Sequence, residues 1–353
     1  MNKNCFQRII SNKEFNTPSN WHKIHCIDMH TGGEPLRVIV DGFPKIKGNG
    51  VLEKRNYVKR NHDNLRKALM WEPRGHADMY GCLLTEPNDD EAHFGVIFMH
   101  NEGYSTMCGH AVIALGKLAI EMGWVDISSD ETKVIIDAPC GRIYTFSKSI
   151  DGKIISTRFH CVPSFVVALN EVVQVEHLGE VTYDLAFGGA FYAYVDADVL
   201  GLELVAENYT EIIKAGRDIK HAVIADSDKI KHPIEADLSF LYGTIFISQK
   251  SSDKANNINV CVFANGEVDR SPTGSGVSGR MAIHHARGEI TIGEKMKIES
   301  IVGSVFTGSV VEEVDFGPFK AVIPEVEGTS YITGQHTFLL DPEDPFKAGF
   351  FLR

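Results

Sequence analysis

The chain carries a thiol and a hydroxyl at equivalent positions of a repeated segment. Residues 93–125 and 258–290 align without a gap at a spacing of 165 residues. In this alignment Cys108 falls on Thr273, and both copies read as strand, turn, thiol or hydroxyl, glycine and then helix. A helix N-terminus has unpaired N–H groups and a positive dipole end, so it favours a thiolate and can hold an anion. The repeat predicts a pseudo-symmetric enzyme that holds a ligand between two helix N-termini, with different tasks for its two sides.

The motif Met-Cys-Gly-His at 107–110 contains the strongest catalytic candidate. A thiolate in a dry cleft is a capable base or nucleophile, so Cys108 is predicted to be catalytic. The alternative for a single cysteine is a buried structural thiol. Gly109 allows a ligand to approach the backbone closely. A cysteine near His110 would also suit an acyl-transferring hydrolase, but this histidine is two residues away on the same turn and the repeat would then have no role.

The second motif, Asp-Arg-Ser-Pro-Thr-Gly-Ser-Gly, begins at Asp269 and supplies the second helix N-terminus. The backbone N–H groups of Gly274 and Ser275 could grip a carboxylate from one side. Those of Gly109 and His110 could grip it from the other side. Asp269 could bind a substrate ammonium or iminium group, or it could instead cap the helix or pair with the neighbouring arginine. These residues are predicted to bind the substrate.

Composition excludes several classes of protein. A length of 353 residues, with 43% hydrophobic and 23% charged residues, is typical of a globular chain of roughly two domains. The net charge of -12 argues against binding to nucleic acid or to an anionic membrane. No apolar run approaches the roughly 18 residues that a membrane-spanning helix needs. We therefore expect a protein that acts on a small molecule.

The sequence contains no pattern that indicates a metal or an organic cofactor. The 15 histidines form no HExxH motif and no Cys/His ligand spacing, and the glycine-rich second motif lacks the P-loop lysine. The seven cysteines are odd in number and form no CxxC, which favours a reduced, cytosolic compartment. Those interpreted as structural are Cys26, Cys82, Cys140, Cys161 and Cys261. We predict no cofactor and no metal.

Two α/β domains are expected to position the motifs. Residues 21–150 together with 331–353 are assigned to a first domain that carries Met-Cys-Gly-His, and residues 151–330 to a second that carries the other motif. Residues 1–20 are predicted to be a disordered tail, since they contain no apolar core. A sheet wrapped around one central helix, built twice, accounts for the alternation of apolar strands and helices. The active site should lie in the cleft between the domains.

Motifs across the chain from Trp21 onward resemble those of the proline racemase family. The two central ones are the active-site motifs at 107–110 and 269–276. The others are DMHTGGEPLRVIV (28–40), EPRGHADMYG (72–81), FGGAFYA (187–193) and DPEDPFKAGF (341–350). The resemblance implies two domains of the diaminopimelate-epimerase type and cofactor-free chemistry at Cα of a proline-like amino acid. It also implies a homodimer as the expected assembly.

The resemblance implies a dehydratase rather than a racemase. Family members that racemise or epimerise carry cysteine in both motifs, and this chain departs from them at Thr273. The branch with this Cys and Thr combination dehydrates trans-3-hydroxy-L-proline. The resemblance carries over Cys108 as the base, Thr273 as the signature position, and five substrate-binding residues. These are Gly109, His110, Asp269, Gly274 and Ser275.

Elementary chemistry favours the same interpretation. Racemisation needs a base on one face of Cα and an acid on the other, and a threonine hydroxyl is a poor proton base. In trans-3-hydroxy-L-proline the Cα hydrogen and the C3 hydroxyl lie on the same ring face. The face of Cys108 and His110 could therefore take the proton and help water leave. The alternatives are an epimerase or racemase that uses Thr273 or a water as second acid, and a non-catalytic proline-binding paralogue.

Overall fold

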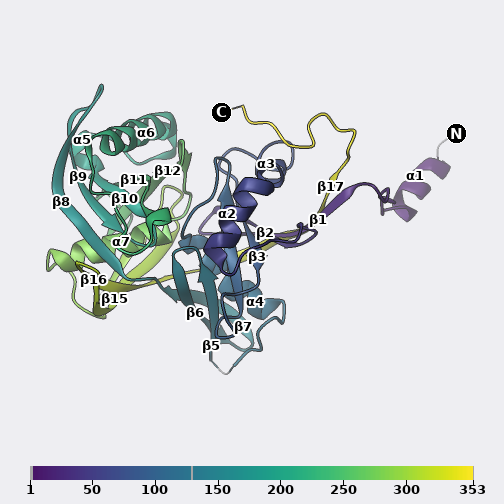
Figure 1. The fold of residues 1–353 in the computed structure, drawn as a ribbon, viewed down its shortest axis with the longest axis horizontal. Coiled ribbons are helices and arrows are strands. Elements are labelled where there is room, and N and C mark those ends of the chain that lie inside the picture. Colours follow the sequence, from purple (N-terminus) through teal and green to yellow (C-terminus); the bar gives the residue numbers. More distant parts are fainter. Residues whose placement is uncertain (1–2, 129, 353) are drawn as a thin grey trace.

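The computed structural model describes residues 3–128 and 130–352, which fold into two domains that lie side by side (Figure 1). A buried helix occupies the centre of each domain: α4 (Gly109–Glu121) in the first and α7 (Gly274–Ala286) in the second. Both helices have 13 residues. Each begins directly after one of the two residues that the repeat aligns, Cys108 and Thr273. The repeat in sequence is therefore a repeat in structure.

The first domain surrounds α4 with strands. They are β1 (His22–Thr31), β2 (Glu34–Asp41), β3 (Tyr80–Thr85), β4 (Phe94–His100), β5 (Glu131–Ala138), β6 (Gly141–Ile150), β7 (Lys153–His160) and β17 (Ser330–Leu340). Two outer helices, α2 (Val51–Asn61) and α3 (Asp63–Met70), pack against β4. α4 is apolar around most of its circumference because it is enclosed on all sides. β17 pairs antiparallel with β1, which brings the C-terminal part of the chain back to this domain (Figure 1).

The second domain surrounds α7 in the same way. Its strands are β8 (Ser164–Val175), β9 (Gly179–Phe187), β10 (Phe191–Asp196), β11 (Leu241–Ser248), β12 (Asn257–Phe263), β13 (Glu267–Val268), β14 (Lys295–Glu299), β15 (Val305–Phe316) and β16 (Phe319–Gly328). Its other helices are α5 (Ala197–Leu200), α6 (Tyr209–Asp226) and the short 3₁₀ turns η1 (Ala206–Asn208) and η2 (Ala236–Leu238). α6 packs on the outside of β11 and β12.

β16 connects the two domains. It pairs antiparallel with β8 of its own domain, through Val322 and Ser164, and with β7 of the first domain, through Glu325 and His160. β7 also pairs with β6 and packs against α4. The sequence placed residues from 151 onward in the second domain, but β7 lies in the first. The predicted boundary differs from the structure because the hairpin turn before β7 has no feature that marks a change of domain.

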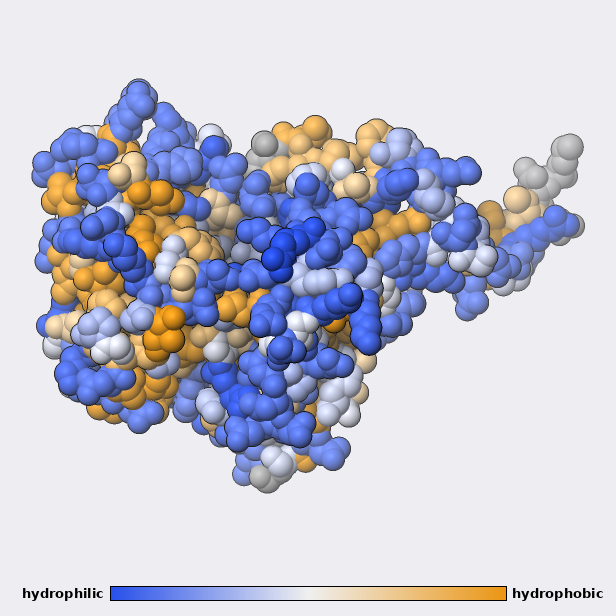
Figure 2. Space-filling model, viewed as in Figure 1, coloured by the Kyte–Doolittle hydropathy of each residue, from blue (hydrophilic) through white to orange (hydrophobic). Residues whose placement is uncertain are grey.

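The fold class expected from the sequence is confirmed: two α/β domains, each a sheet around a central helix. The expected disordered tail differs from the structure. Residues Lys3–Ser11 form a helix, α1, that protrudes from the body of the molecule (Figures 1 and 2). Phe6, Ile9 and Ile10 recur at helical spacing, a signal that the sequence interpretation overlooked, although all three side chains are exposed.

Candidate active site

A cavity between the domains contains all seven residues proposed for the site from the sequence. Its volume is about 20 Å³, room for about one water molecule, so the two domains are close together around it. The residues that line it are Tyr80, Met107, Cys108, Gly109, His110, Tyr192, Tyr242, Phe263, Asp269, Thr273, Gly274 and Ser275. Both central helices start at this cavity.

The two helix starts touch through a pair of glycines. A Cβ atom on Gly109 would lie 2.4 Å from the Cα of Gly274, and one on Gly274 would lie 2.7 Å from the Cα of Gly109. No larger residue fits at either position without moving backbone. Because the first N–H groups of a helix have no intrahelical partner, two sets of donors and two positive dipole ends converge here. This arrangement can bind a carboxylate from both sides.

Cys108 and His110 are in direct contact at the start of α4. The sulfur lies 3.1 Å from His110 Nδ1, and His110 Nε2 lies 3.2 Å from the carbonyl oxygen of Pro35. A carbonyl only accepts, so Nε2 carries the hydrogen and Nδ1 accepts from the thiol. Burial lowers the pKa of His110 to about 3, so the imidazole is neutral.

The resting cysteine is a thiol. Burial raises the pKa of Cys108 well above its ordinary value, although the backbone N–H of Ala111 and the hydroxyl of Tyr80 favour the thiolate. The nearby carboxyls of Asp269 and Glu34 raise this pKa further. The sequence predicts that the helix start favours the thiolate, but burial outweighs that contribution. A ligand has to change the local charge before the thiolate forms.

Two carboxyl groups lie beside the cavity. Asp269 accepts a hydrogen bond from the Ser271 N–H at 2.7 Å, and burial raises its pKa to about 6. At neutral pH it is mostly a carboxylate, available to a ligand cation. Arg270 forms its ion pair with Asp78 instead, at 2.5 Å. Glu34 is fully buried, accepts from the Arg270 N–H at 2.8 Å, and has a pKa raised well above its ordinary value, chiefly by burial.

Thr273 occupies an unfavourable backbone conformation at the start of α7. Its φ of 65° lies in the left-handed region, which costs a β-branched residue of order 1–3 kcal/mol. Its Oγ1 is buried and has no hydrogen-bond partner of standard geometry, although the hydroxyl lies near enough to Asp269 to lower that carboxyl's pKa. Such costs concentrate at functional sites, where a ligand or the mechanism requires them. By contrast, Ser275 Oγ is hydrogen bonded to the hydroxyl of Tyr192 at 2.8 Å.

Sequence reasoning missed the aromatic wall of the cavity. Tyr80 and Tyr192 lie inside motifs that supported the family resemblance, but nothing marked either as functional. Tyr242 lies at the start of β11, outside every motif and upstream of the repeated segment. Its ring stacks on that of Phe263, with centroids 5.4 Å apart. The repeat gave no signal for the three tyrosines, because its two copies begin at β4 and β12 and none of the tyrosines lies within either copy.

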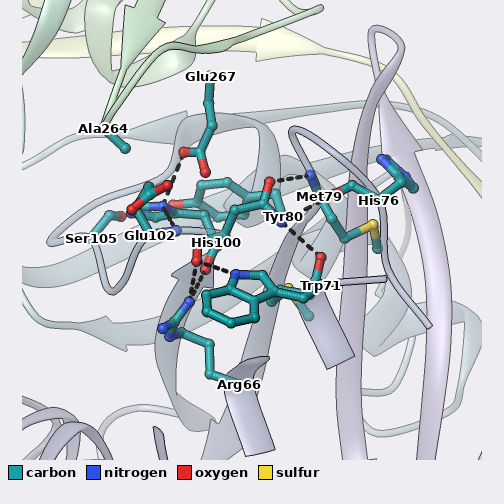
Figure 3. Close-up of polar contacts among 12 residues, drawn as sticks. Arg66, Trp71, His76, Met79, Tyr80, His100, Glu102, Ser105, Ala264 and Glu267 are labelled. Carbon is teal, nitrogen blue, oxygen red and sulfur yellow. Dashed lines mark hydrogen bonds and ion pairs between the residues drawn. The ribbon is translucent and has the colours of Figure 1, made fainter. Parts of the chain in front are cut away.

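A buried contact between a histidine and a carboxyl group joins the domains behind this wall. His100, at the end of β4, lies 3.0 Å from the carboxylate of Glu267 in β13, and both side chains are buried (Figure 3). The His100 ring stacks on Tyr80, with centroids 5.9 Å apart. Arg66 and Trp71 hold the loop after β4 by donating to its carbonyl oxygens (Figure 3). The segment that leads to Cys108 is thereby fixed from both domains.

Within residues 3–128 and 130–352, no three His, Cys, Asp or Glu side chains are grouped so that they could hold a metal ion. None of the helices described in this part of the chain is long and apolar enough to cross a membrane. All seven cysteines are free thiols.

The fold and the paired motifs define a family. The family model for proline racemase matches residues 26–351, and the chain belongs to this family. It is 50% identical to a trans-3-hydroxy-L-proline dehydratase of Colwellia psychrerythraea, over the full length of both chains. It is 45% identical to the human protein of the same name, over 94% of this chain and 95% of the other.

A solved structure shares the same fold throughout. The hydroxyproline epimerase of Agrobacterium vitis, with bound trans-4-hydroxy-L-proline, superimposes with a TM-score of 0.87 at 29% identity. The match covers 94% of this chain and 96% of the epimerase. The two-domain architecture is therefore that of the family.

Proposed function

We propose that this chain is a cofactor-independent trans-3-hydroxy-L-proline dehydratase, a hydro-lyase that forms Δ1-pyrroline-2-carboxylate. The observation that carries the proposal is the pairing of Cys108 with Thr273 across one cavity, in a chain 45–50% identical to dehydratases along nearly its whole length. One thiol supplies one competent base, which suits elimination better than racemisation.

The cavity contains a complementary group for each part of the substrate. The carboxylate lies between the two helix starts, where the N–H groups at Gly109, His110, Gly274 and Ser275 face it. The ring ammonium lies near the Asp269 carboxylate. This orientation presents one face of Cα to Cys108. Donors fixed in advance around the carboxylate stabilise the negative charge that develops when the Cα proton leaves.

Substrate binding activates the thiol. The ring ammonium places a positive charge in the cavity, and a nearby opposite charge favours the thiolate. The thiol proton leaves to solvent as the cationic substrate binds, because the His110 ring, whose pKa burial lowers to about 3, is a poor proton acceptor. Cys108 removes the Cα proton, the electrons form the Cα–C3 double bond, and the C3 hydroxyl leaves as water. The enamine product then tautomerises to the ketimine.

The test is direct incubation with trans-3-hydroxy-L-proline. We expect a ketimine, detected with o-aminobenzaldehyde or by mass spectrometry, and none from Cys108→Ala, which should remain folded and bind pyrrole-2-carboxylate. Epimerisation at Cα without loss of water would instead support a hydroxyproline epimerase. More than a few per cent of activity in Cys108→Ala would contradict its assignment as the base.

A cytosolic location and a homodimer also remain proposals. A catalytic thiol is preserved best in a reducing compartment, which supports the location. Cell fractionation and light scattering after gel filtration test the two statements separately.

A further inference from the structure

The hydroxyl hydrogens near Cys108 can be assigned directions. Ser105 Oγ donates to the carbonyl oxygen of Met107 at 3.1 Å. The hydroxyl of Tyr80 lies 2.7 Å from Ser105 Oγ, and because the serine hydrogen is committed to Met107, Tyr80 is the donor of this bond. Ser105 therefore holds this hydrogen, and the Tyr80 hydroxyl has to turn away from Ser105 to donate it to Cys108. The ring N–H of His110 is likewise committed to Pro35.

Tyr242 is the exception among the three tyrosines that line the cavity, because Tyr80 is hydrogen bonded to Ser105 and Tyr192 to Ser275. Its side chain is 6% exposed, and its hydroxyl oxygen is buried without a hydrogen-bond partner of standard geometry. Burial raises the pKa of this phenol well above its ordinary value, Glu267 and Cys108 add to the rise, and the Tyr80 hydroxyl opposes it. Tyr242, Tyr80 and Cys108 all line the same cavity. A buried hydroxyl is normally satisfied, and an exception at a cavity indicates a partner supplied by the ligand.

The substrate supplies an oxygen at this place. The departing C3 hydroxyl lies on the same ring face as the Cα hydrogen, hence on the Cys108 side of the cavity. Hydroxide is a poor leaving group and needs a proton from a positioned donor. Resting on the proposed dehydratase function, we propose that Tyr242 is a catalytic residue whose hydroxyl binds the C3 hydroxyl of the substrate and protonates it as the C3–O bond breaks.

The step balances without a further reagent. The Cα proton moves to the Cys108 sulfur, and the C–H electron pair becomes the second bond between Cα and C3. The C3–O pair leaves with the oxygen, which takes the Tyr242 proton and departs as water. The phenolate then recovers a proton from the Cys108 thiol. This transfer restores the phenol and the thiolate, and the thiolate regains its proton from solvent when the product leaves.

The decisive variant is Tyr242→Phe, which removes the hydroxyl and retains the ring that stacks on Phe263. We expect kcat for trans-3-hydroxy-L-proline to fall at least about 100-fold, the lower range for loss of a general acid. In D2O the variant should still exchange the Cα hydrogen of the substrate, because Cys108 is intact. Pyrrole-2-carboxylate, which has no C3 hydroxyl, should bind within about twofold of the wild type.

The matched control is Tyr104→Phe. It removes another buried hydroxyl without a partner of standard geometry, from a residue in the neighbouring crevice rather than in the cavity. Its activity should stay close to that of the wild type. A comparable loss in this control would overturn the assignment, since any buried tyrosine hydroxyl would then matter.

A second substrate separates acid catalysis from a structural effect. trans-3-Fluoro-L-proline loses fluoride, which needs far less help from an acid, so Tyr242→Phe should eliminate it at nearly the wild-type rate. Equal losses on both substrates, or turnover of the hydroxyl substrate within threefold of the wild type, would overturn the proposal. A wild type that makes no ketimine would instead refute the dehydratase function, and this inference with it.

Difluorotyrosine at position 242 gives the same answer if Tyr242→Phe does not fold. It keeps the shape of the residue and makes the phenol more acidic. The basic limb of the pH profile of kcat should then move to lower pH, since the phenol at position 242 loses its proton at lower pH. An unmoved limb would overturn the role of Tyr242.

Discussion

Replacing Gly109 by alanine tests the contact between the two helix starts. The added Cβ would lie 2.4 Å from the Cα of Gly274, whereas ordinary contacts begin at 3.4 Å, so the two first turns must separate by about 1 Å. A displacement of about 1 Å in a catalytic arrangement can cost on the order of a hundredfold in rate. The overpacking should also lower the free energy of unfolding by roughly 1–3 kcal/mol. We therefore expect a folded variant with kcat/KM about 100-fold below the wild type.

The assay combines ketimine formation with a thermal-shift measurement of pyrrole-2-carboxylate binding. Gly109→Ala should weaken both, because the same donors hold substrate and inhibitor. Gly103→Ala is the control, since a Cβ at that position meets nothing within 4 Å. Gly274→Ala should resemble Gly109→Ala, because its Cβ would lie 2.7 Å from the opposite Cα. A folded Gly109→Ala with kcat/KM within threefold of the wild type and unchanged inhibitor binding would refute the two-sided carboxylate site.

Four further outcomes are expected. The value of kcat/KM should fall as the pH drops below about 6, because Asp269, whose pKa is raised to about 6, must be ionised to hold the ring ammonium. Asp269→Asn should remove this acidic limb of the pH profile. Thr273→Cys should gain weak racemisation of L-proline, measured by chiral chromatography in D2O, whereas racemisation by the wild type would show that this position does not limit the reaction. Pyrrole-2-carboxylate should inhibit competitively as a planar mimic of the carbanion, and no binding at millimolar concentration would argue against that intermediate. Dialysis against a chelator should leave activity unchanged, and a loss restored by Zn²⁺ would contradict metal-free chemistry.

The central geometry could be predicted from the sequence because it depends on local signals. A strand, a turn and a glycine before an apolar helix define a helix start wherever they occur, and two copies define two starts. The positions of Cys108 and Thr273 followed directly from the ungapped repeat. The helix start that the two copies share could be predicted without knowledge of how the domains pack.

Properties that depend on tertiary packing were not predictable in this way. Cys108 is a thiol because residues distant in sequence bury it. The position of a residue at a helix N-terminus gives no information about such burial. Tyr242 reaches the cavity because β11 pairs with β12, and no sequence motif indicates this pairing. β7 joins the first domain through its partners β6 and β16 rather than through its own composition. In each case the missing information was the identity of a neighbour in space.

The contact between Gly109 and Gly274 has a consequence for how such a site can arise. Two separate copies of one half-chain could bring their helix starts together in the same way, but each copy would then carry the same residue before its glycine. A symmetric pair can have two thiols or two hydroxyls, never one of each. Only when both halves belong to a single polypeptide can one position change alone. Covalent fusion of the halves is thus the condition under which a two-base site can become a one-base site.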